Sequence, residues 1–256
     1  MVISAASPTP KAASRGKRPT SPTRSSARSK LSERPERQRR LVYGRRKGPA
    51  LSAHQERLRE TLLPTLALHL EAGRDPRRYF ANVDDVWLEV GYGGGEHLLW
   101  QAQQHPHIGL IGAEPYISGT AKLLSKLDQT PISNIRLYED DARDIIEALP
   151  DASIGRAFIL FPDPWPKTRH HKRRFVQMDT LDAFARILKP GAELRFASDD
   201  AGYLAYALER LMAHPAFCWT ANGPSDWKTR TSDWPPTRYE AKELHGAPVF
   251  LRFVRT

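Results

Sequence analysis

Two kinds of hydrophobic pattern alternate along the chain from about residue 86. Short apolar runs, typical of buried strands, occupy 86–90, 108–113, 134–138, 157–161 and 192–197. Longer segments with apolar residues every three or four positions, typical of amphipathic helices, occupy 96–104, 117–127, 142–149, 174–188 and 203–214. Strands joined by helix-length connections favour parallel pairing, so the pattern predicts an α/β fold with helices on both faces of the sheet.

The two ends of this pattern differ from its middle. A helical pattern of leucines runs from His54 to Leu70 and is interrupted by Pro64. Near the other end, the strand-like segments 217–221 and 249–254 are joined without a long apolar helix. Because parallel strands need a long crossover and antiparallel strands do not, we expect an antiparallel pair at the edge of the sheet.

The basic residues are concentrated at one end of the chain. The 256 residues include 39 Lys and Arg against 29 Asp and Glu, but residues 1–50 alone hold a net charge of +12 and the remainder −2. Residues 1–35 have few large apolar side chains, which predicts a disordered basic arm, although a Ser- and Arg-rich transit peptide has a similar composition. We expect one domain at 36–256, with the basic run of residues 36–47 on the surface that meets the substrate.

Several classes of protein are excluded by what the chain lacks. The single cysteine, Cys218, rules out an internal disulfide and a multi-cysteine metal site, and the adjacent His170 and His171 are poorly spaced to share a metal. No apolar run approaches the roughly 18 residues that a membrane span needs. We therefore expect a soluble, cytoplasmic protein with no metal and no membrane partner.

A glycine-rich turn follows the first predicted strand of the sheet. Gly91, Gly93 and Gly95 can adopt backbone angles that other residues avoid, and they let a ligand approach the main chain. A dinucleotide-binding turn would carry glycine at position 96, whereas Glu96 would repel a pyrophosphate there. With Glu89 just before the turn, the pattern favours a cofactor that has no phosphate and carries a positive charge, such as S-adenosylmethionine.

Acidic residues also end the second and third predicted strands. Glu114 follows the second strand at the spacing where an acid commonly binds a ribose diol, and Asp140 and Asp141 follow the third. Each acid on its own is equally well explained as a helix N-cap or a solvated turn. Three acids ending three successive strands beside a glycine turn indicate a cofactor site.

The fourth predicted strand leads into a proline-rich turn. The sequence Phe-Pro-Asp-Pro-Trp-Pro at 161–166 restricts the backbone and presents Asp163 and Trp165 at the same edge of the sheet. A flat aromatic ring beside an acid suits a planar base. The basic run at 169–174 follows at once, and although such runs are usually solvated, its position here favours contact with a nucleic-acid backbone.

These motifs together resemble the bacterial-type tRNA (guanine-N7-)-methyltransferases over about residues 38–255. They read LEVGYGGG at 88–95, GAEPY at 112–116, DDARD at 140–144, FPDPWPKTRHHKRR at 161–174, ASD at 197–199 and TRYEAK at 237–242. The resemblance implies a class I methyltransferase, with a seven-stranded, mostly parallel sheet and a reversed edge strand. It also implies methyl transfer from S-adenosylmethionine to N7 of a guanine in the variable loop of tRNA, with no obligatory protein partner evident.

The resemblance assigns roles to individual residues. Those implied to contact the cofactor are Glu89, Glu114, Asp141 and Asp163, beside the glycines 91, 93 and 95, and Asp163 is also the active-site acid. Those implied to bind tRNA are Lys167, Arg169, Lys172, Arg173, Arg174, Asp199, Thr237, Arg238, Tyr239 and Glu240. The chain departs from the family's usual pattern at Thr237-Arg-Tyr-Glu240, where Thr-Lys-Phe-Glu is frequent, and at Pro166, where His is frequent.

Three alternatives fit part of the pattern. A DNA amino-methyltransferase carries a similar Asp-Pro-Pro-Trp motif, but its residue order differs and no separate DNA-recognition domain is visible. A nicotinamide oxidoreductase is disfavoured by Glu96. A non-catalytic RNA-binding module should lack the acids at the cofactor site, and all of them are present.

Overall fold

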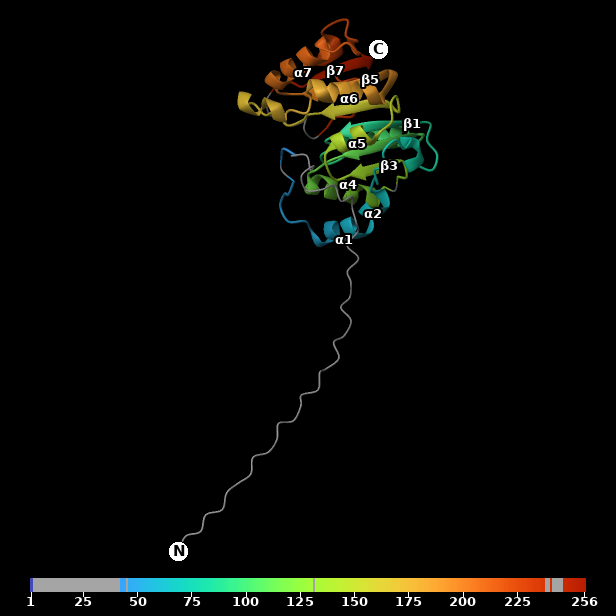
Figure 1. Ribbon diagram of the computed structural model, residues 1–256, viewed down its shortest axis with the longest axis vertical. Coiled ribbons are helices and arrows are strands. Elements are labelled where there is room, and N and C mark those ends of the chain that lie inside the picture. Colours follow the sequence, from blue (N-terminus) through green and yellow to red (C-terminus); the bar gives the residue numbers. More distant parts are fainter. Residues whose placement is uncertain (2–41, 45, 131, 238–239, 241–245) are drawn as a thin grey trace. The chain divides into compact units, whose positions relative to one another are not determined.

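The computed structural model describes residue 1 and residues 42–256 except 45, 131, 238–239 and 241–245. The chain divides into two units, Met1–Arg39 and Arg40–Thr256, and only the second has an extensive described structure (Figure 1). The predicted basic arm at 1–35 and most of the basic run at 36–47 lie outside the described residues. The fold therefore concerns the second unit alone.

A single seven-stranded sheet forms the centre of this unit. Its strands are β1 (Asp85–Val90), β2 (Ile108–Ala113), β3 (Ile135–Tyr138), β4 (Ile154–Leu160), β5 (Leu188–Ser198), β6 (Phe217–Trp219) and β7 (Val249–Arg255). They lie in the order β3-β2-β1-β4-β5-β7-β6. Strands β1 to β5 pair in parallel, whereas β7 runs antiparallel to both β5 and β6. The predicted mostly parallel sheet is confirmed, and its reversed strand is β7, one position in from the edge.

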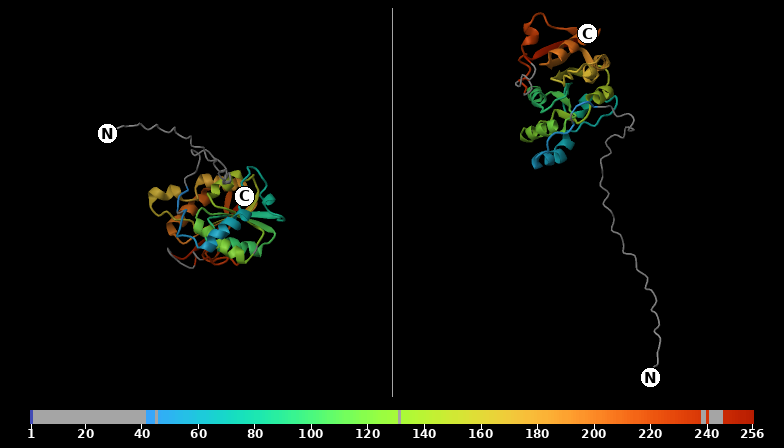
Figure 2. Two further views of the ribbon diagram at one scale, coloured as in Figure 1. Left: turned by 90° about the horizontal axis from the view of Figure 1, so that it is seen from below. Right: turned by 90° about the vertical axis from the view of Figure 1, so that its left-hand side faces the viewer.

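Helices cover both faces of the sheet (Figures 1 and 2). The helical elements are α1 (Ala53–Thr61), α2 (Leu63–Leu66), η2 (Pro76–Tyr79), α3 (Glu96–Gln104), α4 (Ile117–Gln129), α5 (Ala142–Ala148), η3 (Thr168–Arg173), α6 (Met178–Ile187), α7 (Ala201–Ala213) and α8 (Ser225–Lys228). Apolar side chains of α5, α6 and α7 pack on one face, and those of α1, α2, α3 and α4 pack on the other. Strand β1 supplies both cores by alternation, since Val86 and Leu88 join the first and Trp87 the second.

Two predicted helices differ in extent from the observed ones. The leucine pattern beyond Leu66 is not helical, because Leu68 donates its backbone N–H to the Leu137 carbonyl and extends along β3. The helix predicted over 174–188 begins only at Met178, where the Thr180 hydroxyl accepts the backbone N–H of Gln177 at 2.9 Å. The hydrophobic periodicity overestimated the length of both helices, because backbone groups at their ends form hydrogen bonds outside the helix.

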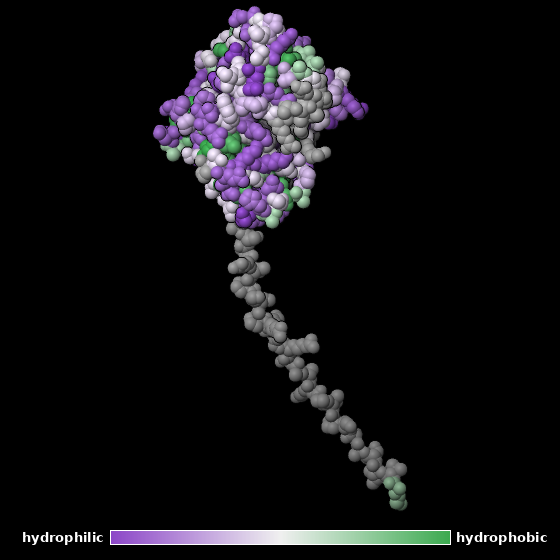
Figure 3. Space-filling view, turned by 180° about the vertical axis from the view of Figure 1, so that it is seen from behind, coloured by the Kyte–Doolittle hydropathy of each residue, from purple (hydrophilic) through white to green (hydrophobic). Residues whose placement is uncertain are grey.

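The described surface is mainly polar. Figure 3 shows hydrophilic residues over most of one face of this unit, with small, scattered apolar spots. Met178 and Met212 are the large hydrophobic side chains of the second unit that stand out to solvent among the described residues. In the part of the chain that is described, no helix combines the length and the apolar character needed to cross a membrane.

Candidate functional site

The glycine-rich turn connects β1 to α3 at the carboxyl end of the sheet. Gly91, Gly93 and Gly95 have φ angles of +72°, +54° and +72°, in the left-handed region that L side chains rarely occupy. Gly91 and Gly93 line a pocket above the sheet. Gly95 instead packs against α4, because a Cβ atom there would lie 2.6 Å from Cδ1 of Leu123.

Glu114 at the end of β2 holds this turn in shape. Its carboxylate accepts hydrogen bonds from the backbone N–H groups of Gly93 at 2.7 Å and Tyr116 at 2.8 Å. Burial raises the pKa of the Glu114 carboxyl, an effect that the two backbone donors partly oppose. From the far side, Lys126 Nζ donates to the Gly94 carbonyl at 2.8 Å. The acid is thus both a wall of the pocket and a support for the turn.

Glu89 lies beneath the turn and does not line the pocket. Only 2% of the residue is exposed, and its carboxylate is 2.8 Å from Nδ1 of His97. Gln101 continues this buried chain by contacting Nε2 of His97 at 3.1 Å. The predicted direct cofactor contact of Glu89 stays a prediction, since the structure places this carboxylate in a buried network that sequence reasoning missed.

Asp141 begins α5 and also faces the pocket. As the N-cap, it accepts the backbone N–H of Arg143, and the Nε atom of Arg143 donates to the same carboxylate at 3.0 Å. Asp141 therefore acts as a helix cap and is also placed to contact a ligand in the pocket. The carboxylate can accept further hydrogen bonds, because each oxygen has more than one acceptor site.

Asp163 lies in the turn that leaves β4. Phe161 and Trp165, which each precede a proline, have φ angles of +48° and +44°, a conformation that costs free energy for bulky residues. The Asp163 side chain is accessible at the mouth of the pocket, yet partial burial raises the pKa of its carboxyl. A carboxylate so placed favours a cationic ligand.

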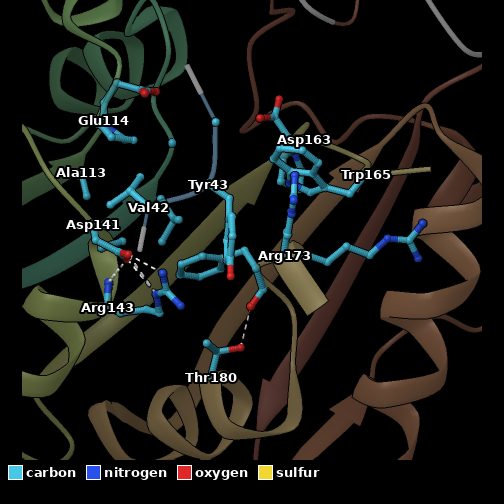
Figure 4. Close-up of a pocket in the computed structure, with 18 of the residues that line it drawn as sticks. Val42, Tyr43, Ala113, Glu114, Asp141, Arg143, Asp163, Trp165, Arg173 and Thr180 are labelled. Atoms are coloured by element: carbon cyan, nitrogen blue, oxygen red, sulfur yellow. Dashed lines mark hydrogen bonds and ion pairs between the residues drawn. The ribbon is translucent and has the colours of Figure 1, made fainter. Parts of the chain in front are cut away.

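These groups surround one pocket of about 410 Å³, a size typical of small-molecule sites. In Figure 4, Glu114, Asp141 and Arg143 lie on one side and Asp163, Trp165 and Arg173 on the other, with Tyr43 between them. The structure thus brings together the acids that end β2, β3 and β4. No group of three or more His, Cys, Asp or Glu side chains suited to a metal ion occurs among the described residues.

The basic run after the proline turn divides into exposed and buried members. Lys167, Arg169 and Lys172 are exposed, and Lys172 also lines the pocket. Arg174 is only 3% exposed. Its Nε donates to the Pro164 carbonyl at 2.8 Å and its Nη1 to the Gly202 carbonyl at 3.2 Å. The guanidinium also contacts the rings of Tyr203 and Tyr206. Arg174 therefore helps to hold the turn and also lines the pocket, and its contact with RNA stays a prediction.

The remaining substrate candidates lie outside the pocket lining. Asp199 follows β5 and is partly buried. Thr237 and Glu240 form two reciprocal hydrogen bonds. The Thr237 hydroxyl accepts the Glu240 backbone N–H at 3.2 Å, and the Glu240 carboxylate accepts the Thr237 backbone N–H at 3.3 Å. Arg238 and Tyr239 lie outside the described residues. The roles of all five in tRNA binding stay predictions.

A buried anchor that sequence reasoning missed holds the segment before Thr237 against the sheet. Nη2 of Arg195 donates a hydrogen bond to the Asp233 carboxylate at 2.7 Å. Hydrogen bonds from Arg195 and Thr231 and the positive charge of Arg195 lower the pKa of the Asp233 carboxyl, although desolvation opposes them. The neighbouring Trp234 is 1% exposed and packs on His97 and Phe250. The sequence feature that could have indicated this anchor is Trp234 itself, a large apolar side chain directly before Pro235 and Pro236.

The strand order, the left-handed glycine turn after β1 and the acids at the carboxyl ends of β2, β3 and β4 define a class I methyltransferase. A family model described as "Putative methyltransferase" matches residues 84–249. The tRNA (guanine-N(7)-)-methyltransferase of Rhodospirillum rubrum is 53% identical over 221 residues, covering 83% of this chain and 87% of its own. That of Brucella anthropi is 50% identical over 218 residues, covering 83% and 94%. The chain belongs to the tRNA (guanine-N(7)-)-methyltransferase family.

Solved structures include more distant neighbours. The 16S rRNA methyltransferase KamB superposes with a TM-score of 0.49 at 15% identity, over 73% of this chain and 96% of its own.

Proposed function

We propose that this enzyme transfers a methyl group from S-adenosylmethionine to N7 of a guanine in the variable loop of tRNA, in the cytoplasm. The observation that carries the proposal is the single pocket that holds Glu114, Asp141 and Asp163 beside Trp165. The relatives, named tRNA (guanine-N(7)-)-methyltransferases, support the same substrate and the same purine atom.

The chemistry of the pocket fits this cofactor. The backbone at Gly91 and Gly93 has no Cβ atoms to obstruct a ligand, and Glu114 can accept hydrogen bonds from a ribose diol. Asp141 lies where it can meet the adenine, and the Asp163 carboxylate favours a positive charge. Bound S-adenosylmethionine would supply an electrophilic methyl carbon on a positively charged sulfur.

The target atom needs no general base. Guanine N7 carries a lone pair and no proton, so the protein's main task is to hold the purine in line with the methyl carbon. Positive charge develops on the purine during transfer, and the fixed carboxylate of Asp163 can stabilise it. Trp165 offers a flat surface for the base. We assign Asp163 electrostatic and positioning roles and no proton transfer.

The exposed cations beside the pocket are suited to a phosphate backbone. Lys167, Arg169 and Lys172 follow directly after the Asp163 turn, so a nucleotide inserted at Trp165 would bring its neighbouring phosphates near them. By family resemblance, Asp199, Thr237 and Glu240 would complete the substrate surface, together with Arg238 and Tyr239.

Mass analysis of tRNA nucleosides after incubation with the enzyme and isotope-labelled S-adenosylmethionine tests the proposal. Labelled 7-methylguanosine, mapped to the variable loop by nuclease fragments, is the expected product. A base methylated on an exocyclic amino group would instead support the amino-methyltransferase alternative. Absence of label from every tRNA nucleoside, with a folded protein, would refute the proposal.

A further inference from the structure

Two aromatic rings from distant parts of the chain form an open corner beside the pocket. The ring centroids of Tyr43 and Trp165 are 6.4 Å apart, and their planes meet at 74°. The guanidinium carbon of Arg173 lies 5.1 Å from the Tyr43 centroid and 4.9 Å from the Trp165 centroid. The corner therefore holds a planar cation against both of its walls, an arrangement favoured by the negative faces of aromatic rings (Figure 4).

Arg173 differs from its neighbour in how its guanidinium is held. Arg174 donates two hydrogen bonds to backbone carbonyls, whereas the buried Nε of Arg173 has no hydrogen-bond partner. Among the described residues, the contacts that hold the Arg173 guanidinium are those with the two rings. A second planar cation that satisfies the same rings could replace it at small cost, because no hydrogen bond at Nε has to be broken.

The segment that carries Tyr43 is fixed next to the reacting groups. A Cβ atom on Gly44 would lie 3.3 Å from Oδ2 of Asp163, so the backbone after Tyr43 passes beside that carboxylate. A few residues on, the Arg46 carbonyl accepts the Ile117 N–H at 3.0 Å, and Arg46 Nη1 is 3.0 Å from Asp140. Both walls of the corner therefore adjoin the acid assigned to the purine.

We propose that Tyr43 and Trp165 form the binding site of the target guanine and favour it in its methylated, cationic form, with Arg173 occupying that site until the base enters. This inference rests on the proposed function. Methyl transfer forms the bond from N7 to carbon, leaves the electron pair of the broken bond on sulfur and places a positive charge on the purine. A site that already stabilises a planar cation would therefore bind the developing charge more tightly than the neutral base.

Equilibrium binding of two nucleosides tests this preference. Guanosine and 7-methylguanosine would be titrated into the full-length enzyme with S-adenosylhomocysteine, in a mildly acidic buffer that keeps the methylated base cationic. We expect tighter binding of 7-methylguanosine, and a loss of about 2- to 30-fold in its affinity in Tyr43→Ala, the range of a single cation–π contact. Tyr43→Phe should bind nearly as the wild type does, because the ring remains.

Two further variants separate this role from general destabilisation. Tyr79→Ala removes a tyrosine that also contacts an arginine, Arg74 at 4.8 Å, away from the pocket, and should leave nucleoside binding unchanged. Arg173→Ala removes the competing cation, so the affinity for 7-methylguanosine should rise while the affinity for tRNA falls. A lower affinity for 7-methylguanosine in Arg173→Ala would show that the guanidinium itself holds the base and would overturn the proposed exchange.

The inference and the proposed function can fail separately. If the wild type forms no 7-methylguanosine in tRNA, the proposed function is wrong and the corner loses its substrate. If the wild type methylates tRNA but binds both nucleosides equally, or if Tyr43→Ala binds them as the wild type does, the corner is not the guanine site. Thermal melting of each variant would show whether it is folded in these assays.

Discussion

Asp163 illustrates how a residue that serves the proposed reaction can oppose folding. Its carboxyl has a raised pKa because it is partly desolvated. A group with a raised folded-state pKa stabilises the fold most fully when protonated, below the pKa of the unfolded chain, and this contribution is lost as pH rises through the folded-state pKa. At neutral pH, the ionised Asp163 therefore imposes a cost on folding that a bound cation would relieve.

Replacing Asp163 by asparagine should separate activity from stability. Asp163→Asn mimics the protonated form, so its melting temperature at neutral pH should equal or exceed that of the wild type, and the difference should vanish in acid. Methylation of tRNA should be abolished or nearly so. A folded variant that keeps more than half of the wild-type turnover would remove Asp163 from the site.

Glu114 offers a second test at the scale of one residue. Glu114→Ala should weaken the binding of S-adenosylhomocysteine by about 1–3 kcal/mol, because a charge-assisted hydrogen bond to the ribose and the support of the glycine turn are both lost. Isothermal calorimetry measures this directly. Glu139→Ala is the matched control, since that carboxylate ends the neighbouring strand but pairs with Arg59. Equal affinities in Glu114→Ala and the wild type would refute the assignment.

At the scale of elements, the proline turn after β4 is secured to α7 by a buried side chain. Arg174 joins the Pro164 carbonyl to the Gly202 carbonyl and packs on Tyr203 and Tyr206. The turn carries Asp163 and Trp165, so Arg174 helps to position the site. The family motif includes this arginine in a basic run, but its burial sets it apart from Lys167, Arg169 and Lys172, which are exposed.

Paired variants should distinguish these tasks. Arg174→Ala should lower the unfolding free energy by about 1–3 kcal/mol, because two carbonyls lose their buried donors, and should leave the salt dependence of tRNA binding unchanged. Lys167→Ala should preserve the melting temperature and flatten the logarithmic salt dependence by about 0.7–0.9 per lost phosphate contact. Salt titrations and thermal melts check both, and a flatter slope for Arg174→Ala would place that guanidinium on RNA.

At the scale of the whole molecule, most of the basic segment lies outside the pocket. Residues 1–50 hold a net charge of +12 against −2 in the rest, and within them Val42, Tyr43 and Gly44 line the pocket, all beyond the arm at 1–35. The basic arm at 1–35 is therefore expected to act on encounter with RNA through charge alone, without shaping the site.

Deletion of residues 1–35 should leave turnover at saturating tRNA close to that of the full-length enzyme. The apparent affinity for tRNA should fall at low salt, and the difference between the two proteins should close as salt screens the arm. Methylation kinetics over a salt series measure both quantities. Lost turnover at saturating tRNA would make the arm part of the site, and no difference at any salt would favour a targeting segment or a dispensable tail.

The sequence by itself determined the strands of the parallel part of the sheet, the position of the glycine turn and the presence of acidic residues after the strands. Alternation of apolar runs with helical periodicity located β1 to β5, and α3 was predicted at its observed bounds, Glu96–Gln104. Gly91 and Gly93 indicated the turn, because few other residues tolerate the left-handed backbone conformation that both adopt. These features depend on neighbours a few residues apart, and such information is present in any short stretch of sequence.

Only the tertiary structure decided which side chains share the site. Tyr43 meets Trp165 and Arg173 across more than a hundred residues of sequence, and Arg174 is buried although Lys172 is exposed. Glu89, predicted beside the cofactor, lies under the turn with His97. A local pattern records what a side chain is, whereas its partner, burial and charge state depend on segments that the fold brings together from far along the chain.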